Sequence, residues 1–194
     1  IFFKNFQKLV ESGKPYLGRV IGLEDGKDYK TYPKEDSLSG KLELLPYVAS
    51  VSMILPSKIV EETGFFDENL GAGATWASSE DLDYFIRCCQ LQEFTYHRKL
   101  YNLHPSRFGK YQQLSTKKIK TRFKGYTDGY LFVMFRYKLE EKVDSLPLRA
   151  VAGAAVSLLK GSFRLVPIYL WLAKYRIQMI RFFRDKNPSF FELQ

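Results

Sequence analysis

The sequence predicts an α/β fold for residues 1–112, followed by a helical and basic region over residues 113–194. Helical and strand-like apolar patterns alternate in the first part, which is the order from which layered α/β domains are built. The second part has helical apolar periodicity and no strand pattern. Hydrophobic residues make up 45% of the chain and aromatic residues 16%, enough for a packed core rather than a disordered chain.

Short apolar, β-rich runs bounded by polar or turn-forming residues predict the strands of the first part. Pro46 lies near the start of the longest run, where a strand tolerates a residue without an amide proton. The polar residues 24–40 predict a loop. The predicted strands cover residues 17–23, 44–55 and 94–98, with another extended piece at 100–104.

Helical apolar spacing predicts three helices in the first part, at residues 1–12, from about Ser57, and at residues 80–91. Pro56 immediately precedes the second helix, a position that suits a helix start. Residues 67–79, which are rich in glycine and carry aromatic side chains, predict a loop before the third.

Three further helices are predicted in the second part, at residues 117–137, 147–160 and 164–184. Their longest uncharged runs, at 150–159 and 165–173, are much shorter than the roughly 20 residues that cross a bilayer. We therefore expect these helices to lie on a surface rather than to span a membrane.

The last predicted helix has an apolar side and a basic side, the distribution expected at a membrane interface. Packing of the apolar side on the protein's own core, with the basic side solvated, is an equally good interpretation. The apolar side contains Leu165, Ile168, Leu172, Tyr175, Met179 and Phe183, and the basic side contains Lys174, Arg181 and Arg184.

Charge is distributed unevenly along the chain. Residues 1–97 contain 10 Lys and Arg against 15 Asp and Glu, whereas residues 98–194 contain 20 against 6. The halves carry −5 and +14, which together give the net charge of +9. A strongly basic half that is rich in aromatic residues predicts contact with an anionic surface, either phospholipid or nucleic acid.

The two cysteines, Cys88 and Cys89, are adjacent within a predicted helix. Their side chains point about 100° apart there, which excludes an ordinary disulfide between them. Cys89 shares helical spacing with Leu82, Phe85 and Ile86, so core packing is favoured over metal or redox chemistry. We expect two reduced thiols in a cytoplasmic setting.

The start of the helix predicted at residues 80–91 is where the sequence predicts chemistry. Glu80, Asp81 and Asp83 crowd there behind the glycine-rich loop, as in a cleft that binds a charged ligand. Asp81 and Asp83 match an Asp-x-Asp metal motif, but side chains two residues apart on a helix point roughly 200° apart. We therefore do not expect both to hold one ion.

These acidic residues also have structural explanations. Asp83 lies four residues before Arg87 and Glu80 lies two turns before it, so an ion-pair ladder accounts for both. Ser78 and Asp81 fit a capping box. Helix geometry still allows one carboxylate, Asp81 or Glu80, to point from the first turn into the cleft and accept a proton from a hydroxyl nucleophile.

The chain carries, in order, Gly-Phe-Phe-Asp-Glu-Asn-Leu-Gly at residues 64–71, Glu-Asp-Leu-Asp at 80–83, Arg87, and His104 followed by proline. Over about residues 1–110 this order resembles the second half of the catalytic domain of family-2 glycosyltransferases with the GT-A fold. The resemblance implies a partial GT-A, Rossmann-like domain of the nucleotide-diphospho-sugar transferase type. It also implies a nucleotide-sugar donor, a divalent metal (Mg²⁺ or Mn²⁺) and an inverting displacement at the anomeric carbon.

The resemblance makes Asp81 the general base toward the acceptor hydroxyl, with Glu80 as the other member of the Glu-Asp pair. It places His104 where such enzymes have a late metal ligand or a contact to the diphosphate; a structural histidine beside proline is an equal alternative. The aromatic face of Trp76 can stack on an acceptor sugar, and Arg107 can neutralise the diphosphate. Core packing of Trp76 and an exposed basic loop around Arg107 are the structural alternatives. The further substrate-binding candidates are Gly71, Gly73, Trp76, Asp83 and Arg107.

Two features depart from the family's pattern. Its nucleotide-binding first half, with its own Asp-x-Asp motif, is absent, and the chain begins at Ile1 without a methionine, so we expect a fragment of a longer enzyme. The Gln-x-x-Arg-Trp motif of processive members has only a near match far downstream, from Gln178 to Phe182. We therefore expect a non-processive hexosyltransferase.

The leading hypothesis is transfer of one sugar to a polysaccharide or lipid-linked acceptor of the cell envelope, by an enzyme bound peripherally to the cytoplasmic face of an anionic membrane. No nucleic-acid partner is expected. The first rival is a nucleic-acid-binding protein, because residues 107–124 place seven basic residues among Phe108, Tyr111 and Phe123. This rival leaves the acidic helix start unexplained. A second rival is a non-catalytic membrane adaptor on a truncated transferase fold.

Overall fold

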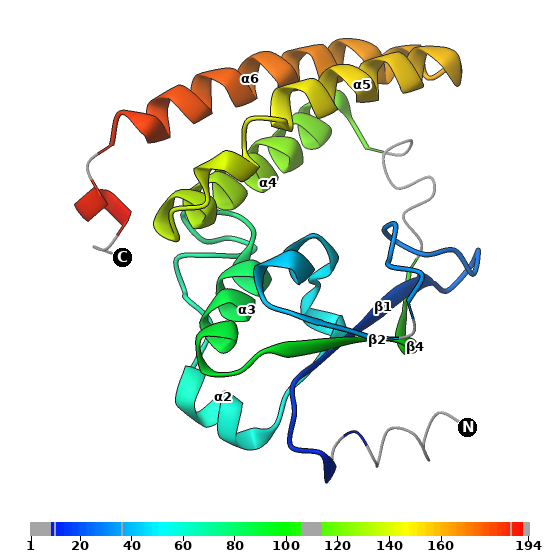
Figure 1. Ribbon diagram of the computed structural model, residues 1–194. Coiled ribbons are helices and arrows are strands. Elements are labelled where there is room, and N and C mark those ends of the chain that lie inside the picture. The colour runs from blue at the N-terminus through cyan, green and yellow to red at the C-terminus, as the bar shows by residue number, and fades with distance from the viewer. Residues whose placement is uncertain (1–8, 10, 36, 106–113, 187, 192–194) are drawn as a thin grey trace. The chain divides into compact units, whose positions relative to one another are not determined.

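The computed structural model describes residues 9, 11–35, 37–105, 114–186 and 188–191 (Figure 1). The chain divides into two compact units. The first comprises Ile1–Asp67 and Asp81–Lys110, and the second comprises Glu68–Glu80 and Tyr111–Gln194. The helix predicted at residues 1–12 lies almost entirely outside the described residues.

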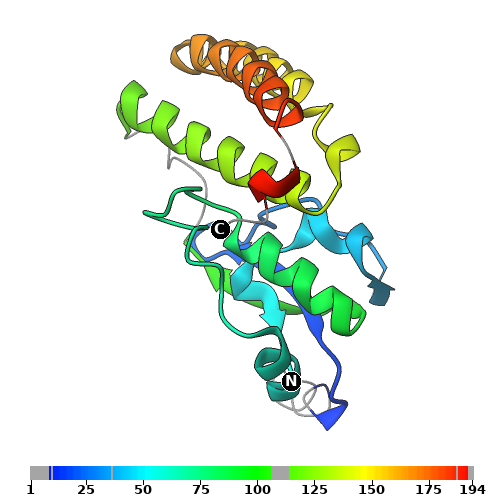
Figure 2. The same ribbon diagram turned by 90° about the vertical axis from the view of Figure 1, so that its left-hand side faces the viewer.

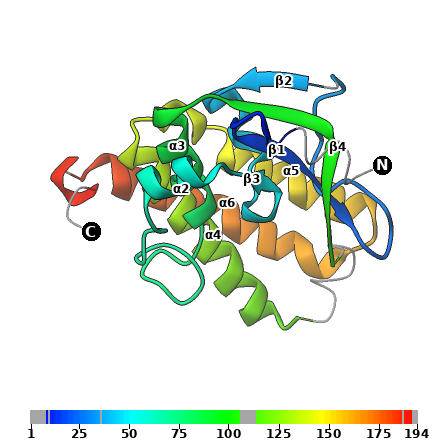
Figure 3. The same ribbon diagram turned by 90° about the horizontal axis from the view of Figure 1, so that it is seen from below.

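The first unit contains a four-stranded mixed sheet with the strand order β2-β4-β1-β3; its strands are labelled in Figure 3. The parallel pair β1 and β4 aligns Gly22 with His104, so the carboxyl ends of both strands meet at one edge. β3 pairs antiparallel with β1, and β2 pairs antiparallel with β4. The strands are β1 (Tyr16–Gly22), β2 (Ser37–Gly40), β3 (Met53–Ile54) and β4 (Phe94–His104).

The strand predicted at residues 17–23 is confirmed, and the two extended pieces predicted after residue 94 form the single strand β4. β2 was not predicted, because it is short, polar and mostly exposed. An edge strand that buries almost nothing has no apolar alternation by which a sequence could reveal it.

The long strand predicted at residues 44–55 is wrong. This run forms two 3₁₀ helices, η1 (Leu42–Tyr47) and η2 (Ser50–Ser52), and contributes only β3 to the sheet. Pro46 lies inside η1, where its fixed φ suits a turn. Leu44 and Val48 are nevertheless fully buried, so the apolar run predicted burial correctly and backbone conformation incorrectly.

Two helices complete the first unit as the sequence predicts, α2 (Ser57–Thr63) and α3 (Glu80–Leu91). Phe85 of α3 is fully buried and packs on Phe94 of β4, with ring centroids 4.6 Å apart. Cys88 and Cys89 are free, buried thiols on the same helix, which confirms their core role. The helical spacing of apolar residues thus fixes which side of α3 faces the sheet.

The second unit is built around three helices, α4 (Thr116–Arg136), α5 (Leu146–Leu159) and α6 (Val166–Arg184), as predicted. The Ser115 side chain accepts a hydrogen bond from the Lys118 amide at the start of α4. α5 and α6 lie side by side, and α6 also packs against α4 (Figures 2 and 3). Short 3₁₀ turns follow the helices, namely η3 (Glu140–Lys142), η4 (Phe163–Leu165) and η5 (Pro188–Phe191).

Half-buried polar contacts join these three helices. The Tyr175 hydroxyl of α6 donates to Asp128 Oδ1 of α4 at 2.6 Å, and burial raises the pKa of both groups. Arg176 Nη1 donates to the Leu146 carbonyl of α5 at 2.7 Å. Because these donors and acceptors satisfy one another, the basic sequence of α6 can pass through a largely apolar interface.

The predicted apolar side of α6 packs on the protein's own core, which supports the second of the two interpretations. Ile168, Leu172 and Phe183, from the predicted apolar side, are buried inside the unit. Ile168 and Leu172 share a core cluster with Phe123 of α4 and Ala150 of α5. The predicted basic side is exposed.

None of the helices in the described part of the chain combines the length and the apolar content that crossing a bilayer requires.

Two glycines on one face of α4 allow residues 77–78, just before α3, to lie against this helix. A Cβ atom at Gly129 would overlap the Ser78 carbonyl oxygen, and one at Gly125 would lie 3.1 Å from the Ala77 Cβ. The Ser78 hydroxyl donates to the Gly125 carbonyl at 3.0 Å. Because residues four apart share a helix face, Gly125 and Gly129 form one continuous contact for the segment.

We expect Gly129→Ala to lower the free energy of unfolding by about 2 kcal/mol, because the added methyl group meets a backbone oxygen that cannot rotate away. Gly125→Ala is the control. A Cβ atom at Gly125 has a longer closest contact than one at Gly129, and alanine is favoured over glycine in a helix by up to about 1 kcal/mol. We therefore expect a smaller loss of stability for Gly125→Ala. Urea unfolding followed by circular dichroism measures both. Wild-type stability for Gly129→Ala would contradict the close approach.

We also expect both thiols to resist alkylation by a maleimide at pH 8. Burial raises the pKa of Cys89 to about 12 and that of Cys88 in the same direction, and the thiolate is the reactive form. Mass spectrometry should find unmodified protein in native buffer and two adducts in guanidinium. Rapid native labelling of either thiol would show that α3 does not pack as described.

Candidate functional site

The glycine-rich loop before α3 belongs to the second unit and is closed by its own backbone. The Gly71 amide donates to the Trp76 carbonyl, and the Trp76 amide donates to the Asn69 carbonyl, each at 2.9 Å. Gly71 and Gly73 have φ values of 106° and 90°, which residues other than glycine rarely adopt. The two glycines are therefore explained by the shape of the loop.

Glu80 lies next to this loop. A Cβ atom at Gly71 would lie only 3.3 Å from the Glu80 Cδ, so glycine at this position leaves room for the carboxyl group. The structure thus brings together two of the predicted site residues, one from the loop and one from the helix start.

Trp76 packs on aromatic side chains of the same unit. Its ring stacks on Phe132 with centroids 4.7 Å apart and planes at 15°, and it lies 5.5 Å from Phe183. This is the core packing that the sequence allowed as an alternative to stacking on a sugar. One face of the indole is already covered by protein.

Asp83 is fully buried and binds Arg87. Its Oδ2 accepts from Arg87 Nε at 2.9 Å, and Arg87 also donates to the carbonyls of Thr63 and Phe65, at 2.7 and 2.9 Å. The structural interpretation of Asp83 is therefore supported. Glu80 is not among these described partners of Arg87. Of the two ion pairs predicted for Arg87, the described contacts therefore contain the one with Asp83.

The same arginine explains why the Gly-Phe-Phe segment after α2 lies against α3. Gly64 ends α2 with φ 76°, and the next carbonyl, that of Phe65, accepts from Arg87. Phe66 stacks on Tyr84 with ring centroids 4.4 Å apart. The Arg87 guanidinium lies over the ring of the same tyrosine, 5.0 Å from its centroid. The Gly-Phe-Phe segment therefore has a structural role, because Phe65 and Phe66 both contact α3.

Asp81 occupies the first turn of α3 and is partly exposed. Its Oδ1 accepts a hydrogen bond from the Leu82 amide at 2.9 Å. A carboxylate in the first turn interacts favourably with the positive end of the helix dipole, and an ionised carboxylate is the form that accepts a proton. The boundary between the two units falls between Glu80 and Asp81.

His104 ends β4 in the first unit. Its Nδ1 lies 2.9 Å from the Tyr29 hydroxyl oxygen and 3.2 Å from the Pro105 carbonyl oxygen. Nδ1 either accepts from the Tyr29 hydroxyl or donates to the Pro105 carbonyl, so these contacts hold the ring in place for either tautomer. The ring is held edge-on to Tyr29, with centroids 5.4 Å apart. Tyr29 lies in a polar turn and had no signal in the sequence.

Within the described residues, no group of three or more His, Cys, Asp and Glu side chains could hold a metal ion. His104 Nε2 has the chemistry of a single ligand. Arg107 lies outside the described residues, so its predicted contact with a diphosphate stays a prediction.

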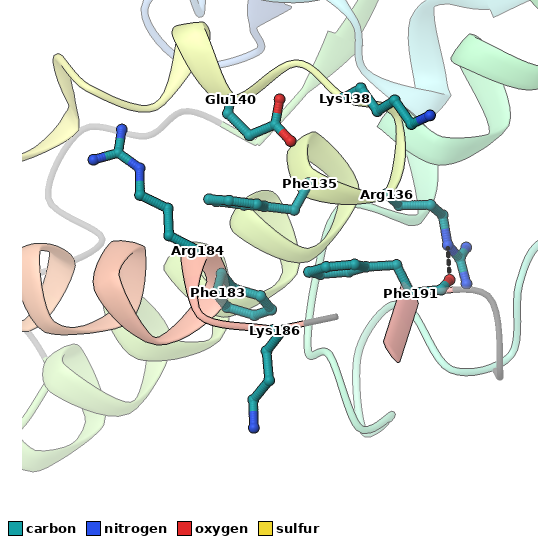
Figure 4. Close-up of a pocket in the computed structure, with 8 residues that line it drawn as sticks. All are labelled: Phe135, Arg136, Lys138, Glu140, Phe183, Arg184, Lys186 and Phe191. Carbon is teal, nitrogen blue, oxygen red and sulfur yellow. Dashed lines mark hydrogen bonds between the residues drawn. The ribbon is translucent and has the colours of Figure 1, made fainter. Parts of the chain in front are cut away.

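A cavity of about 430 Å³ lies in the second unit, where α4 and α6 end (Figure 4). Its aromatic residues are Phe135, Phe183 and Phe191, and cationic side chains surround them. Arg136 donates to the Phe191 carbonyl at 3.2 Å, and Arg184 pairs with Asp144. These cations therefore have structural partners, which weakens the cavity as an anion site.

No protein-family model matches the chain, and neither a search of curated proteins nor a search of solved structures found a match.

We expect Asp83→Asn to lower the free energy of unfolding by about 2–3 kcal/mol, because it leaves the Arg87 guanidinium without its carboxylate partner. Asp81→Asn is the matched control two residues away; loss of its dipole interaction should cost less than about 1 kcal/mol. Urea unfolding measures both variants. Equal stabilities would contradict the distinction between a buried carboxylate paired with Arg87 and a partly exposed one.

Proposed function

We propose that the protein is an inverting, non-processive glycosyltransferase in which Asp81 is the general base. The observation that carries this proposal is the different placement of the acidic residues at the start of α3. Asp83 is buried and bound by Arg87, whereas Asp81 is partly exposed in the first turn of the helix. A base must reach its substrate's proton, and of these two only Asp81 has solvent access.

The proposed reaction is one displacement. The acceptor hydroxyl attacks the anomeric carbon of the nucleotide-diphosphate sugar while Asp81 takes the hydroxyl proton. The bond from that carbon to the diphosphate oxygen breaks, and its electron pair leaves with the nucleoside diphosphate. Attack opposite the leaving group inverts the configuration. Glu80, beside the glycine loop, is the second carboxylate proposed near the acceptor.

The α/β architecture of the first unit is compatible with the GT-A fold that we propose for it. Its parallel strands end together, and this edge carries His104. The imidazole of His104 suits a contact to a metal through a neutral ring nitrogen or to the diphosphate through a ring N–H. A divalent metal would neutralise charge at the diphosphate when bound. Among the described residues His104 is the one proposed ligand, and the proposed displacement does not require the metal for proton transfer to Asp81.

The remaining assignments are proposals from the same resemblance. The donor is a nucleotide sugar, and the acceptor is a polysaccharide or a lipid-linked glycan. Gly71, Gly73, Trp76 and Arg107 are the proposed substrate contacts. We propose a peripheral location at the cytoplasmic face of an anionic membrane, on the charge of +14 that residues 98–194 carry.

We expect Asp81→Asn to lower sugar transfer at least about a hundredfold, the contribution typical of a general base, while leaving affinity for the donor about unchanged. The assay uses the full-length protein. Transfer is measured with radiolabelled donor, and donor affinity by calorimetry.

Glu93→Gln is the control for this assay, because Glu93 is an exposed acidic residue just beyond the other end of α3. It should transfer sugar at the wild-type rate. Turnover retained by Asp81→Asn would refute the assignment of the base. Tight, salt-sensitive binding of the wild-type protein to DNA or RNA would instead favour the nucleic-acid alternative.

A further inference from the structure

The outward side of α5 is apolar. The helix buries Leu146, Ala150, Ala154 and Ser157 within the second unit. On the opposite side, Leu148 is 70% exposed and Leu159 is 86% exposed. Eleven residues separate these two leucines, so they lie on nearly the same helix face. A helix with apolar residues on two opposite sides is normally covered on both of them.

The exposed apolar surface continues beyond these two residues. Phe163, in η4, is 67% exposed. Contiguous apolar surface of this kind marks an interaction site far more often than single exposed apolar residues do. We call the set the α5 face; it consists of Leu148, Val151, Val156, Leu158, Leu159 and Phe163.

The segment that carries the α5 face has charge of one sign. Residues 146–184, which include α5, η4 and α6, contain no Asp or Glu. Their basic residues are Arg149, Lys160, Arg164, Lys174, Arg176, Arg181 and Arg184. An apolar face within a purely cationic segment is the pattern of a surface that meets anionic lipid.

The exposed side of α6 combines the same two properties. Leu170 and Ile177 are half-exposed, and Lys174 and Arg181 lie between and beyond them on the same helical row. In this arrangement long basic side chains can reach headgroups while the apolar residues contact the acyl boundary. α6 thus supplies mixed contacts, and α5 supplies the apolar ones.

We propose that the α5 face inserts into the interfacial layer of a bilayer that contains anionic lipid. Lys160, Lys174 and Arg181 contact the lipid phosphates. This inference deepens the membrane location in the proposed function and does not depend on the transfer reaction. It also moves the inserted surface from α6, whose apolar side is buried, to α5.

Charge and chemistry argue against two other occupants. A second copy of the chain would bring one acid-free, cationic segment against another, which is repulsive. Nucleic acid would use the cations, but it offers phosphates and base edges rather than an acyl layer to six apolar side chains. Lipid uses both features of the surface.

The test uses co-sedimentation of the chain with two kinds of vesicle, one of phosphatidylglycerol and phosphatidylcholine in equal parts and one of phosphatidylcholine alone. We expect wild-type protein to bind the anionic vesicles and to bind less as salt rises. Replacing Leu148 and Leu159 together by glutamine should raise the lipid concentration for half-binding at least about tenfold. Leu23→Gln is the matched control, because Leu23 is 60% exposed in the other unit.

Insertion is read directly from Leu159→Cys labelled with an environment-sensitive fluorophore. The native cysteines are buried, so the new thiol is the one that reacts. We expect a blue shift with anionic vesicles and quenching by lipids that carry a nitroxide near the headgroup. A label that stays in a polar environment while the protein binds would overturn insertion.

The outcomes separate the possible failures. Wild-type protein that ignores anionic vesicles overturns both the membrane location and the α5 face, without bearing on sugar transfer. Binding that the two glutamines leave unchanged overturns the α5 face alone. A dimer that Leu159→Gln converts to monomer, seen by analytical ultracentrifugation without vesicles, would assign the face to a second copy instead.

Discussion

The buried ion pair between Asp83 and Arg87 is the interaction on which the rest of the candidate site depends. A carboxylate without solvent access needs a charged partner, and Arg87 provides it while also binding the Thr63 and Phe65 carbonyls. One guanidinium therefore joins α3 to the chain that leaves α2. The direction in which α3 starts, and with it the position of Asp81, follows from that junction.

A second constraint acts on the other side of Asp81, inside the second unit. Gly125 and Gly129 allow residues 77–78 to lie against α4, and Trp76 is anchored on Phe132. The loop before α3 is thus held by backbone contact, and its glycines serve its shape. Because the loop is tied to one unit and α3 continues in the other, Asp81 stands where the chain passes between them.

The helical unit distributes apolar and basic residues differently from the simple expectation of one amphipathic helix. α6 is amphipathic and turns its apolar side inward, where Tyr175 and Arg176 find partners on α4 and α5. α5 is nearly uncharged, and within the described part of the chain its neighbours leave Leu148 and Leu159 exposed. Core packing removes the apolar side of α6 from water. Insertion into lipid would remove the exposed apolar side of α5 from water in the same way, which is favourable for the same reason.

The sequence by itself determined the helices and the mixed α/β class, because apolar residues repeat with the helical period in α3, α4, α5 and α6. It also determined the pairing of Asp83 with Arg87, which requires only their separation by four residues on a helix. The tertiary structure alone decided that residues 44–55 turn in 3₁₀ helices, that polar β2 joins the sheet, and that His104 meets Tyr29. Those outcomes depend on partners distant in the chain, 75 residues apart for His104 and Tyr29, and local periodicity carries no information about them.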